Sequence, residues 1–396
     1  MGLNDTVSAE RIHITFFGNC NAGKSSLVNA VLGQKLSVVS VLRGTTTDPV
    51  KKAMELLPLG PVVITDTAGL DDESVIGSLR TEKTKEELSR TDIAVLVIDG
   101  TIGETETDRK FRDEIKTRGI PFVEVVNKAD VADVFPDKKR DFLYVSAVTG
   151  EGIEELKVKL GSFTDTVKKE KKLVSDLVSP GDIVVMVTPV DESSPKGRII
   201  LPQQMVLREL LDIHAIPVLC QVEELHSAFA ALSQKPRLVI TDSRVFGEVS
   251  KAVSENIPLT SFSILMARYK GELDALLKGV STLGKLRDGD KVLISEACTH
   301  HRQCNDIGTV KMPEWIRKFS GAEPEFSFTS GRGFPEDVKE YSLVVHCGGC
   351  MINDAEMQNR IKKAEDAGIP MINYGMAIAA MQGVLKRSLV PFGIKL

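Results

Sequence analysis

The chain has 396 residues, of which 42% are hydrophobic and 27% are charged, and its formal net charge is -5. This length exceeds what a single hydrophobic core usually organises, so we expect three domains. A net acidic chain offers no overall positive field to a nucleic-acid backbone. No apolar stretch of the sequence reaches the ~20 residues that cross a bilayer. We therefore expect a cytoplasmic protein without nucleic-acid or membrane partners.

The first domain, expected at residues 1–168, alternates apolar strands with helical stretches. Strands that alternate with helices in this way form a mostly parallel sheet. We therefore predict an α/β fold with a doubly wound sheet. The expected strands are Ile12–Phe17, Val62–Thr65, Ile93–Asp99, Phe122–Asn127 and Phe142–Ser146, and the expected helices are Lys24–Gln34, Arg80–Arg90, Thr107–Arg118 and one that starts near Gly152.

Two smaller α/β domains are expected, at residues 178–264 and 269–396. The sequence of the middle domain contains no glycine-rich phosphate loop and no cluster of catalytic side chains, which favours an assembly role and a homodimer. Both strands of the last domain run directly into cysteines. The expected strands are Ile183–Thr188, Val218–Gln221, Leu238–Thr241, Lys291–Ser295 and Tyr341–Val345, and the expected helices are Gln204–Ile213, Val222–Leu232, Arg244–Ser254 and Asn353–Gly368.

The segment between the first strand and the first helix has the pattern G-x-x-x-x-G-K-[ST], from Gly18 to Ser25. In this context backbone N–H groups surround phosphates at a helix N-terminus, where partial positive charge is concentrated. Lys24 is expected to reach the β- and γ-phosphates, and the Ser25 hydroxyl is expected to bind Mg²⁺. The expected phosphate-binding residues are Gly18, Asn21, Ala22, Gly23, Lys24, Ser25 and Ser26.

Polar residues follow three further strands in the order that a guanine-nucleotide site requires. Asp66 is expected to hold Mg²⁺ through water, and the Gly69 N–H to sense the γ-phosphate. The Asp130 carboxylate can accept two hydrogen bonds from an edge of guanine that adenine lacks, which argues against an ATPase. The alternative interpretations are a helix cap at Asp66 and a turn residue at Asn127. The expected guanine-contacting residues are Asn127, Lys128, Asp130, Ser146 and Ala147.

These motifs resemble the TrmE-Era-EngA-YihA-septin superfamily of GTPases, and the segment Arg43-Gly44-Thr45-Thr46-Thr47-Asp48 resembles its switch I. The resemblance implies that Thr46 binds Mg²⁺, with Thr45 and Thr47 as alternatives. It also implies that Asn21 binds an activating K⁺, the alternative being a plain loop asparagine. Leu70 stands where Ras-like enzymes have a water-orienting glutamine, so intrinsic hydrolysis of GTP to GDP is expected to be slow. The expected catalytic residues are Lys24, Thr46, Asp66 and Gly69.

Two cysteine motifs follow separate strands near the end of the chain, Cys298-Thr299-His300 and His346-Cys347-Gly348-Gly349-Cys350. Thiolates three residues apart can contact one metal centre, and Cys298 would supply a third sulfur. The spacing alone fits a tetrahedral Cys₃His zinc site and an iron–sulfur cluster equally well. A redox-active pair is a third interpretation.

The whole chain resembles the HydF maturation GTPases of iron-iron hydrogenases. The resemblance implies that Cys298, Cys347 and Cys350 bind a 4Fe-4S cluster. It implies a scaffold or carrier for the diiron subcluster, which two radical-SAM partners make and an apo-hydrogenase receives. One iron of the cluster would lack a thiolate. The candidates for that position are Asp306, His300, His346 and Cys304, or water; the alternative for either histidine is a buried ring that donates to the backbone.

Two other functions fit parts of the sequence. The first domain alone points to a potassium-stimulated tRNA-modification or ribosome-assembly GTPase, in which the C-terminal cysteines would form a zinc domain. The cysteines alone also fit a zinc-stabilised interaction protein. Copurifying RNA would favour the first, and zinc without iron would favour the second.

Overall fold

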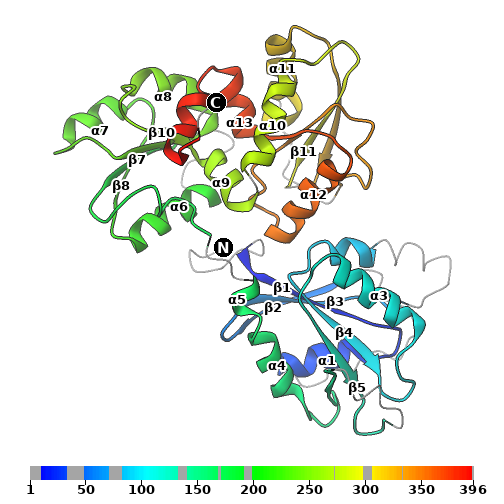
Figure 1. Ribbon diagram of the computed structural model, residues 1–396. Coiled ribbons are helices and arrows are strands. Elements are labelled where there is room, and N and C mark those ends of the chain that lie inside the picture. The colour runs from blue at the N-terminus through cyan, green and yellow to red at the C-terminus, as the bar shows by residue number, and fades with distance from the viewer. Residues whose placement is uncertain are drawn as a thin grey trace. The chain divides into compact units, whose positions relative to one another are not determined.

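The computed structural model describes residues 10–33, 49–70, 83–132, 141–167, 171–190, 199–271, 273–297, 306–331 and 333–394 (Figure 1). The chain divides into two compact units, Met1–Glu170 and Lys171–Leu396. Within the described ranges, no helix combines the length and the apolar character of a membrane span. The domain boundary expected between residues 264 and 269 falls inside the second unit and stays a prediction.

The first unit is built on a six-stranded sheet with the strand order β2-β3-β1-β4-β5-β6. Only β2 runs antiparallel to its neighbour, which confirms the mostly parallel sheet predicted from the sequence. The strands are β1 (Ile12–Phe17), β2 (Val50–Leu56), β3 (Gly60–Asp66), β4 (Ile93–Asp99), β5 (Phe122–Asn127) and β6 (Leu143–Tyr144), and the helices are α1 (Lys24–Val31), α3 (Glu106–Thr117), α4 (Ile153–Gly161) and α5 (Thr164–Val167).

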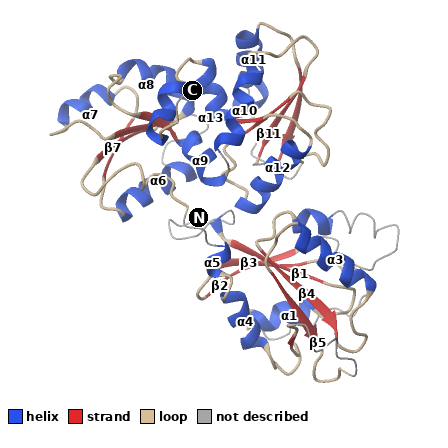
Figure 2. Ribbon diagram, in the orientation of Figure 1, coloured by secondary structure: helices blue, strands red, loops and turns tan. Residues whose placement is uncertain are grey.

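Helices cover both faces of this sheet (Figure 2). Successive residues of a strand point to opposite faces, so the end of β1 supplies both cores. Phe16 packs with Leu27 of α1 and Leu156 of α4 on one face. Phe17 packs on the other face with Phe111 of α3, at 4.9 Å between ring centroids. The two cores fix the carboxyl end of β1, where the phosphate loop begins.

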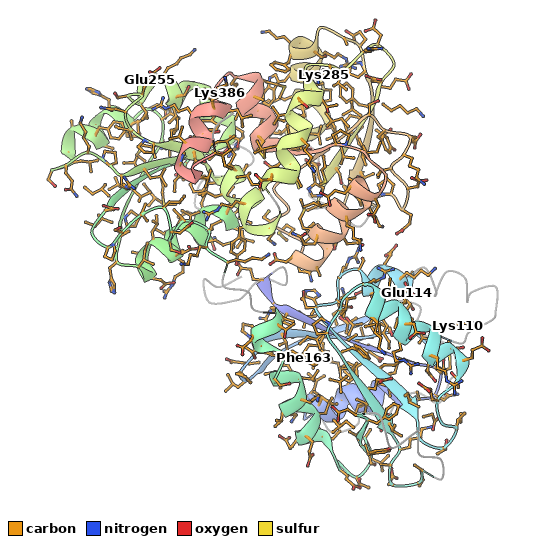
Figure 3. The ribbon with its side chains drawn as sticks, in the orientation of Figure 1. Lys110, Glu114, Phe163, Glu255, Lys285 and Lys386 are labelled. Atoms are coloured by element: carbon orange, nitrogen blue, oxygen red, sulfur yellow. The ribbon has the colours of Figure 1, made fainter. Side chains whose placement is uncertain are left out.

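Helix α3 follows from its local sequence. The Thr105 side chain accepts a hydrogen bond from the Asp108 N–H, and the Asp108 carboxylate accepts one from the Thr105 N–H, which forms a capping box. Lys110 and Glu114 lie among the side chains drawn in Figure 3, and each is ion-paired to a residue on its own helix or beside it. Lys110 is 76% exposed, as expected for the solvent face of an amphipathic helix.

The second unit contains two four-stranded sheets, with the orders β10-β9-β7-β8 and β12-β11-β13-β14. All their strands are parallel. The strands are β7 (Ile183–Val187), β8 (Ile216–Cys220), β9 (Leu238–Thr241), β10 (Leu259–Ser261), β11 (Lys291–Glu296), β12 (Glu325–Ser330), β13 (Leu343–His346) and β14 (Met371–Asn373). The α-helices are α6 (Leu201–Asp212), α7 (Leu225–Ala231), α8 (Phe246–Ala252), α9 (Phe262–Lys270), α10 (Leu273–Leu283), α11 (Met312–Ser320), α12 (Asp354–Asp366), α13 (Tyr374–Met381) and α14 (Leu385–Leu389).

One hydrophobic core joins the two sheets of the second unit. It contains Val239 of β9 and Val344 of β13 together with Ile264 of α9 and Ile378 of α13. Helix α9 begins directly after β10, so it leads from one sheet to the other. The two sheets therefore form one packed body, which accounts for the single unit beyond Glu170.

Candidate nucleotide site and cysteine loop

The predicted phosphate loop lies between β1 and α1, and its geometry requires its two glycines. Gly18 and Gly23 have φ angles of 149° and 87°, in the region that glycine favours. A Cβ at Gly18 would lie 2.2 Å from the Val97 carbonyl oxygen, and one at Gly23 would lie 2.3 Å from Asn127 Nδ2. Asn21 also has a left-handed φ of 62°. Residues of β4 and β5 thus pack directly against this loop and leave room only for glycine at these two positions.

Lys24, at the start of α1, turns its ammonium back over the loop. The side chain is buried, and Nζ donates hydrogen bonds to the Gly18 and Asn19 carbonyl oxygens at 2.9 and 2.8 Å. This arrangement holds a positive charge at the rim of the loop. Of the other predicted loop residues, Ala22 is fully buried and Ser26 is half-buried.

The predicted magnesium residues Ser25 and Asp66 are in contact. Ser25 Oγ donates to Asp66 Oδ2 at 2.5 Å, whereas Asp66 Oδ1 is buried with no hydrogen-bond partner among the described residues. Burial raises the pKa of Asp66 and outweighs the opposing influence of Ser25, Lys24 and Lys52. A hydroxyl beside a carboxylate with a spare buried oxygen suits Mg²⁺, which prefers oxygen ligands. Thr46 lies outside the described residues.

The loop after β3 packs tightly against the phosphate loop. The Leu70 N–H donates to the Gly18 carbonyl oxygen at 3.2 Å. A Cβ at Gly69 would lie 2.2 Å from Cys20 Sγ, so only glycine fits. Gly69 is therefore held next to the loop that would surround the phosphates, and the expected contact of its N–H with the γ-phosphate stays a prediction.

Asn127 joins the phosphate loop to the predicted base pocket. The Asn127 side chain is buried; its Nδ2 donates to the Ala22 carbonyl oxygen at 2.9 Å, and its Oδ1 accepts from the Ala147 N–H at 3.2 Å. Ser146 is also buried, and its Oγ accepts hydrogen bonds from two N–H groups of the following turn. Asp130 lies exposed in the turn after β5. The sheet thus brings the strand-end motifs to one edge, with Asp130 open to a ligand.

Two contacts at this edge were not anticipated from the sequence. Lys128 Nζ donates to Asp99 Oδ2 at 2.6 Å, and Lys128 has a left-handed φ of 64°. Asn19 Nδ2 donates to Thr105 Oγ1 at 2.9 Å, which ties the phosphate loop to the cap of α3. Asp99 could have been recognised as a candidate site residue, because it is a polar residue at the end of a predicted strand. Nothing in the local pattern marked Asn19.

The cysteine loop, residues 347–353, lies between β13 and α12. Strands β11 and β13 are adjacent, but β12 and β14 lie on opposite sides of this pair, so the loop begins where the direction of the strand order reverses. Ligand sites of parallel sheets form at such points. The Cys347 N–H donates to the Ser295 carbonyl oxygen at 2.9 Å, and Cys347 Sγ accepts from the Ala297 N–H at 3.1 Å. Ala297 is the residue before Cys298.

The two cysteines lie in a loop before α12, which starts close to the helix predicted from Asn353. Helix α12 begins at Asp354, because the Asn353 side chain caps it by accepting a hydrogen bond from the Glu356 N–H. Gly349, between the cysteines, has a φ of 67° and donates its N–H to Cys347 Sγ at 3.5 Å. The Cys347 sulfur therefore accepts two backbone N–H groups.

His346 is fully buried, and both of its ring nitrogens have partners. Nδ1 lies 2.7 Å from the Cys347 carbonyl oxygen and Nε2 lies 3.0 Å from Arg360 Nη1. A guanidinium only donates, so Nε2 accepts and Nδ1 carries the proton. Burial, with the charge of Arg360, lowers the pKa of His346 to about 3. This is the buried ring that donates to the backbone, and metal binding by His346 would require either its bond to Arg360 or its bond to the Cys347 carbonyl oxygen to break.

Of the remaining candidate cluster ligands, the structure describes Asp306 and Cys350. Asp306 caps the π-helix Ile307–Lys311, where its Oδ2 accepts from the Thr309 N–H and hydroxyl at 2.8 and 2.9 Å. Burial raises the pKa of the Cys350 thiol. Cys298, His300 and Cys304 lie outside the described residues. Within the described part of the chain, no three His, Cys, Asp or Glu side chains gather as a metal site.

Comparisons with known proteins place the chain among GTPases. The tRNA modification GTPase MnmE of Endomicrobium trichonymphae is 35% identical over 154 residues, which cover 37% of this chain and 34% of that protein. GTPase Der of Kosmotoga olearia is 28% identical over 220 residues, which cover 50% and 49%. The chain thus spans about a third to a half of the length of these curated relatives. The solved structure of a probable GTP-binding protein engB is 23% identical, with a TM-score of 0.32, and covers 39% of this chain and 99% of that one.

Three family models match the chain in succession. Residues 13–128 match the 50S ribosome-binding GTPase family. Residues 173–271 match the hydrogen maturase F dimerization domain, and residues 274–391 match the hydrogen maturase F tetramerization domain. The two hydrogen maturase F models account for nearly all of the second unit. The chain therefore belongs to the HydF-type hydrogenase maturase GTPases.

Proposed function

We propose that this protein hydrolyses GTP and acts as the scaffold or carrier for the diiron subcluster of an iron-iron hydrogenase. Two radical-SAM partners would make the subcluster, and the apo-hydrogenase would receive it. The observation that carries the proposal is the contact between Ala297 and Cys347, because it brings the strand that leads to Cys298 beside the second cysteine motif. The matches to hydrogen maturase F over most of the second unit support the same conclusion.

The nucleotide site would bind GTP and Mg²⁺ at the carboxyl edge of the six-stranded sheet. Lys24 and the loop N–H groups would hold the β- and γ-phosphates, and Ser25, Asp66 and Thr46 would hold Mg²⁺. The metal would neutralise charge that develops on the phosphates. Asp130 would select guanine, and Asn21 would bind an activating K⁺. The GTPase relatives and the contact between Ser25 and Asp66 support this assignment.

The cysteine loop suits an iron–sulfur cluster. Cluster thiolates commonly accept backbone N–H groups, which tune the reduction potential, and Cys347 Sγ already accepts two. Cys298, Cys347 and Cys350 would leave one iron of a 4Fe-4S cluster without a thiolate, and such a position can accept a bridging ligand from a precursor. Asp306, His300 and Cys304 remain candidates for the ligand of this iron. His346 could bind it through Nε2 only if its hydrogen bond to Arg360 broke.

The chain is also proposed to form a homodimer through β8, the outer strand of its sheet. Ile216 and Leu219 of this strand are 50% and 38% exposed. An apolar edge strand is a template for pairing with a second chain. Leu219→Lys should shift the sedimentation coefficient from dimer to monomer, and an unchanged dimer would contradict this assignment of the interface.

Anaerobic reconstitution with iron and sulfide tests the cluster. We expect Cys347→Ala and Cys350→Ala to lose bound iron and the absorbance near 400 nm, while GTP hydrolysis stays within about twofold of wild type because the metal site lies in the other unit. Cys220→Ser, which changes a thiol on β8, is the matched control and should load normally. Full iron loading in Cys347→Ala would overturn the site.

A hydrogenase maturation assay tests the role. Activation of the apo-hydrogenase should require this protein and should fail with Cys347→Ala. Undiminished activation without the protein would refute the scaffold function, even if the cluster forms.

A further inference from the structure

Asn19, the second residue of the phosphate loop, connects that loop to the start of α3. Its Nδ2 donates to Thr105 Oγ1 at 2.9 Å and to Asp108 Oδ2 at 3.2 Å. The Thr105 hydroxyl itself donates to Asp108 Oδ2 at 2.7 Å, so both partners present acceptors to Asn19. The amide nitrogen of Asn19, and not its oxygen, therefore has to face α3.

The cap of α3 that receives Asn19 is held at several points. Asp108 is 1% exposed, and its Oδ2 also accepts from the Thr105 N–H at 2.9 Å. The loop that leads from β4 to this cap is bonded at its start to β5, where the Gly100 N–H donates to the Asn127 carbonyl oxygen at 2.9 Å. The Asn19 side chain thus attaches the phosphate loop to a well-connected part of the fold.

The main chain of Asn19 contacts the ammonium group of Lys24. The Asn19 carbonyl oxygen accepts from Lys24 Nζ at 2.8 Å and from the Ala22 N–H at 3.3 Å. The position of this carbonyl group therefore helps to set where the positive charge lies at the rim of the loop. A continuous path of hydrogen bonds runs from the cap of α3 through Asn19 to Lys24.

We propose that Asn19 is a positioning residue for GTP hydrolysis, whose side-chain amide holds the phosphate loop, before a nucleotide binds, in the conformation that receives the β- and γ-phosphates. The inference rests on the nucleotide site proposed above. A loop that is competent for only a fraction of the time binds its ligand more weakly by that fraction. Loss of the Asn19 amide should therefore weaken nucleotide binding about tenfold, or ~1.4 kcal/mol, which is the scale of one hydrogen bond.

The test compares Asn19→Ala with wild type in the full-length protein. Titrations with fluorescent GDP and with a fluorescent non-hydrolysable GTP analogue, both with Mg²⁺, measure affinity. We expect both dissociation constants to rise about tenfold, because the two nucleotides share the β-phosphate. KM for GTP should rise by the same factor, since KM equals the dissociation constant when hydrolysis is slow. The value of kcat should change by less than about twofold, because bound phosphates then hold the loop.

A double-mutant cycle with Thr105→Ala tests whether α3 is the anchor. Thr105→Ala removes the nearer of the two acceptors of Asn19. In that background Asn19→Ala should raise the dissociation constants by less than about threefold, since the effects of contacting residues are not additive. A tenfold effect in both backgrounds would mean that Asn19 acts independently of α3, and the inference would fall.

Ile115→Val is the matched control for a general weakening of α3. Ile115 is a fully buried residue of this helix, and the shorter side chain should lower the denaturant midpoint of unfolding. Both dissociation constants should stay at the wild-type values. If Ile115→Val weakens nucleotide binding as much as Asn19→Ala does, the effect comes from the stability of α3 and the inference is wrong.

The other outcomes bear on separate claims. A wild-type protein that binds neither nucleotide would overturn the nucleotide site itself. Wild-type affinity in Asn19→Ala would overturn only the role of Asn19, and so would a fall in kcat at unchanged KM, because that pattern marks an interaction made only in the transition state. If circular dichroism shows that Asn19→Ala is unfolded while Ile115→Val is folded, Asn19 acts in folding and the inference also falls.

Discussion

The Ser25 hydroxyl donates a 2.5 Å hydrogen bond to the Asp66 carboxylate, which joins the start of α1 to the end of β3. We propose that these two oxygen-bearing side chains hold the nucleotide-bound Mg²⁺, Asp66 through water. Ser25→Ala should lower kcat for GTP hydrolysis by about 100-fold, or ~2.7 kcal/mol of activation free energy. Steady-state rates over a Mg²⁺ titration check this. The control Ser162→Ala removes a hydroxyl that bonds only to its own helix. Equal Mg²⁺ dependence in Ser25→Ala and wild type would contradict the assignment.

Alanine substitutions at Gly23 and Gly33 distinguish the cost of backbone strain from the cost of a steric clash. Both have a left-handed φ, of 87° and 66°, but a Cβ meets Asn127 only at Gly23 and meets nothing within 4 Å at Gly33. Gly33→Ala should therefore cost only the left-handed strain, roughly 1–2 kcal/mol of unfolding free energy. Gly23→Ala should in addition weaken GTP binding by about 100-fold or more. Fluorescent-nucleotide titration and denaturant unfolding measure the two effects, and tight GTP binding by Gly23→Ala would be the contrary result.

Asp130 lies exposed after β5, with its carboxylate open to a base. Asp130→Asn should reduce GTP affinity by on the order of 100-fold, since an unmatched polar edge is strongly rejected. The same change should improve xanthosine triphosphate binding, because the amide can donate to the carbonyl group that replaces the guanine amino group. Competition binding with both nucleotides measures the switch. Asp141→Asn alters a carboxylate that is 87% exposed and should leave the preference unchanged. An unaltered preference in Asp130→Asn would remove this residue from the base pocket.

Lys128 and Asp99 form an ion pair whose contribution depends on pH. Burial alone would raise the pKa of Asp99, but hydrogen bonds from Lys128 and Thr101 outweigh it and hold the pKa below the usual 3.8. A carboxyl group with a lowered folded-state pKa stabilises the fold above its unfolded pKa, and that stabilisation is lost as the pH falls through the folded value. Asp99→Asn should cost about 1 kcal/mol at pH 7. Denaturant unfolding should give the same difference at pH 5 and a smaller one below 3.8; a difference that grows toward acid would be inconsistent with the pair.

Asn21 is exposed in the phosphate loop with a φ of 62°. If it binds K⁺, GTP hydrolysis should be at least about tenfold faster in KCl than in NaCl at equal ionic strength, since a cation beside the transferred phosphoryl group stabilises charge that develops there. Asn21→Ala should remove the difference and leave the slow rate in NaCl nearly unchanged. Equal rates of the wild type in the two salts would eliminate the potassium site.

The position of the nucleotide motifs could be predicted because parallel strands end at one edge of their sheet. Once Asp66, Asn127 and Ser146 were placed at strand ends, their proximity followed. The hydrogen bonds that these residues make could not be predicted in the same way. Asn127 contacts Ala147 because β5 pairs with β6, and it contacts Ala22 because the loop after β1 reaches across β4; no local pattern encodes this strand order.

Three of the elements that escaped prediction lack the periodic patterns that mark a strand or helix. Strands β10 and β14 have three residues each, too few for alternation to be visible. Helix α13 is buried around most of its circumference and has no polar face. For His346, the sequence left two roles open, and the choice depended on Arg360, which comes from α12 and reaches the ring only after folding.

Because Gly69 packs closely on Cys20, oxidation or alkylation of the Cys20 thiol can by itself inactivate GTP hydrolysis. Cys20 is exposed, and its sulfur fills the space where a Cβ of Gly69 would lie. An oxygen atom or an alkyl group added to this sulfur would lie against the loop that contains Gly69. Inactivation of GTP hydrolysis by oxidation is therefore not proof that the nucleotide site communicates with an iron–sulfur cluster, and a Cys20→Ser background separates chemical damage in the phosphate loop from genuine coupling.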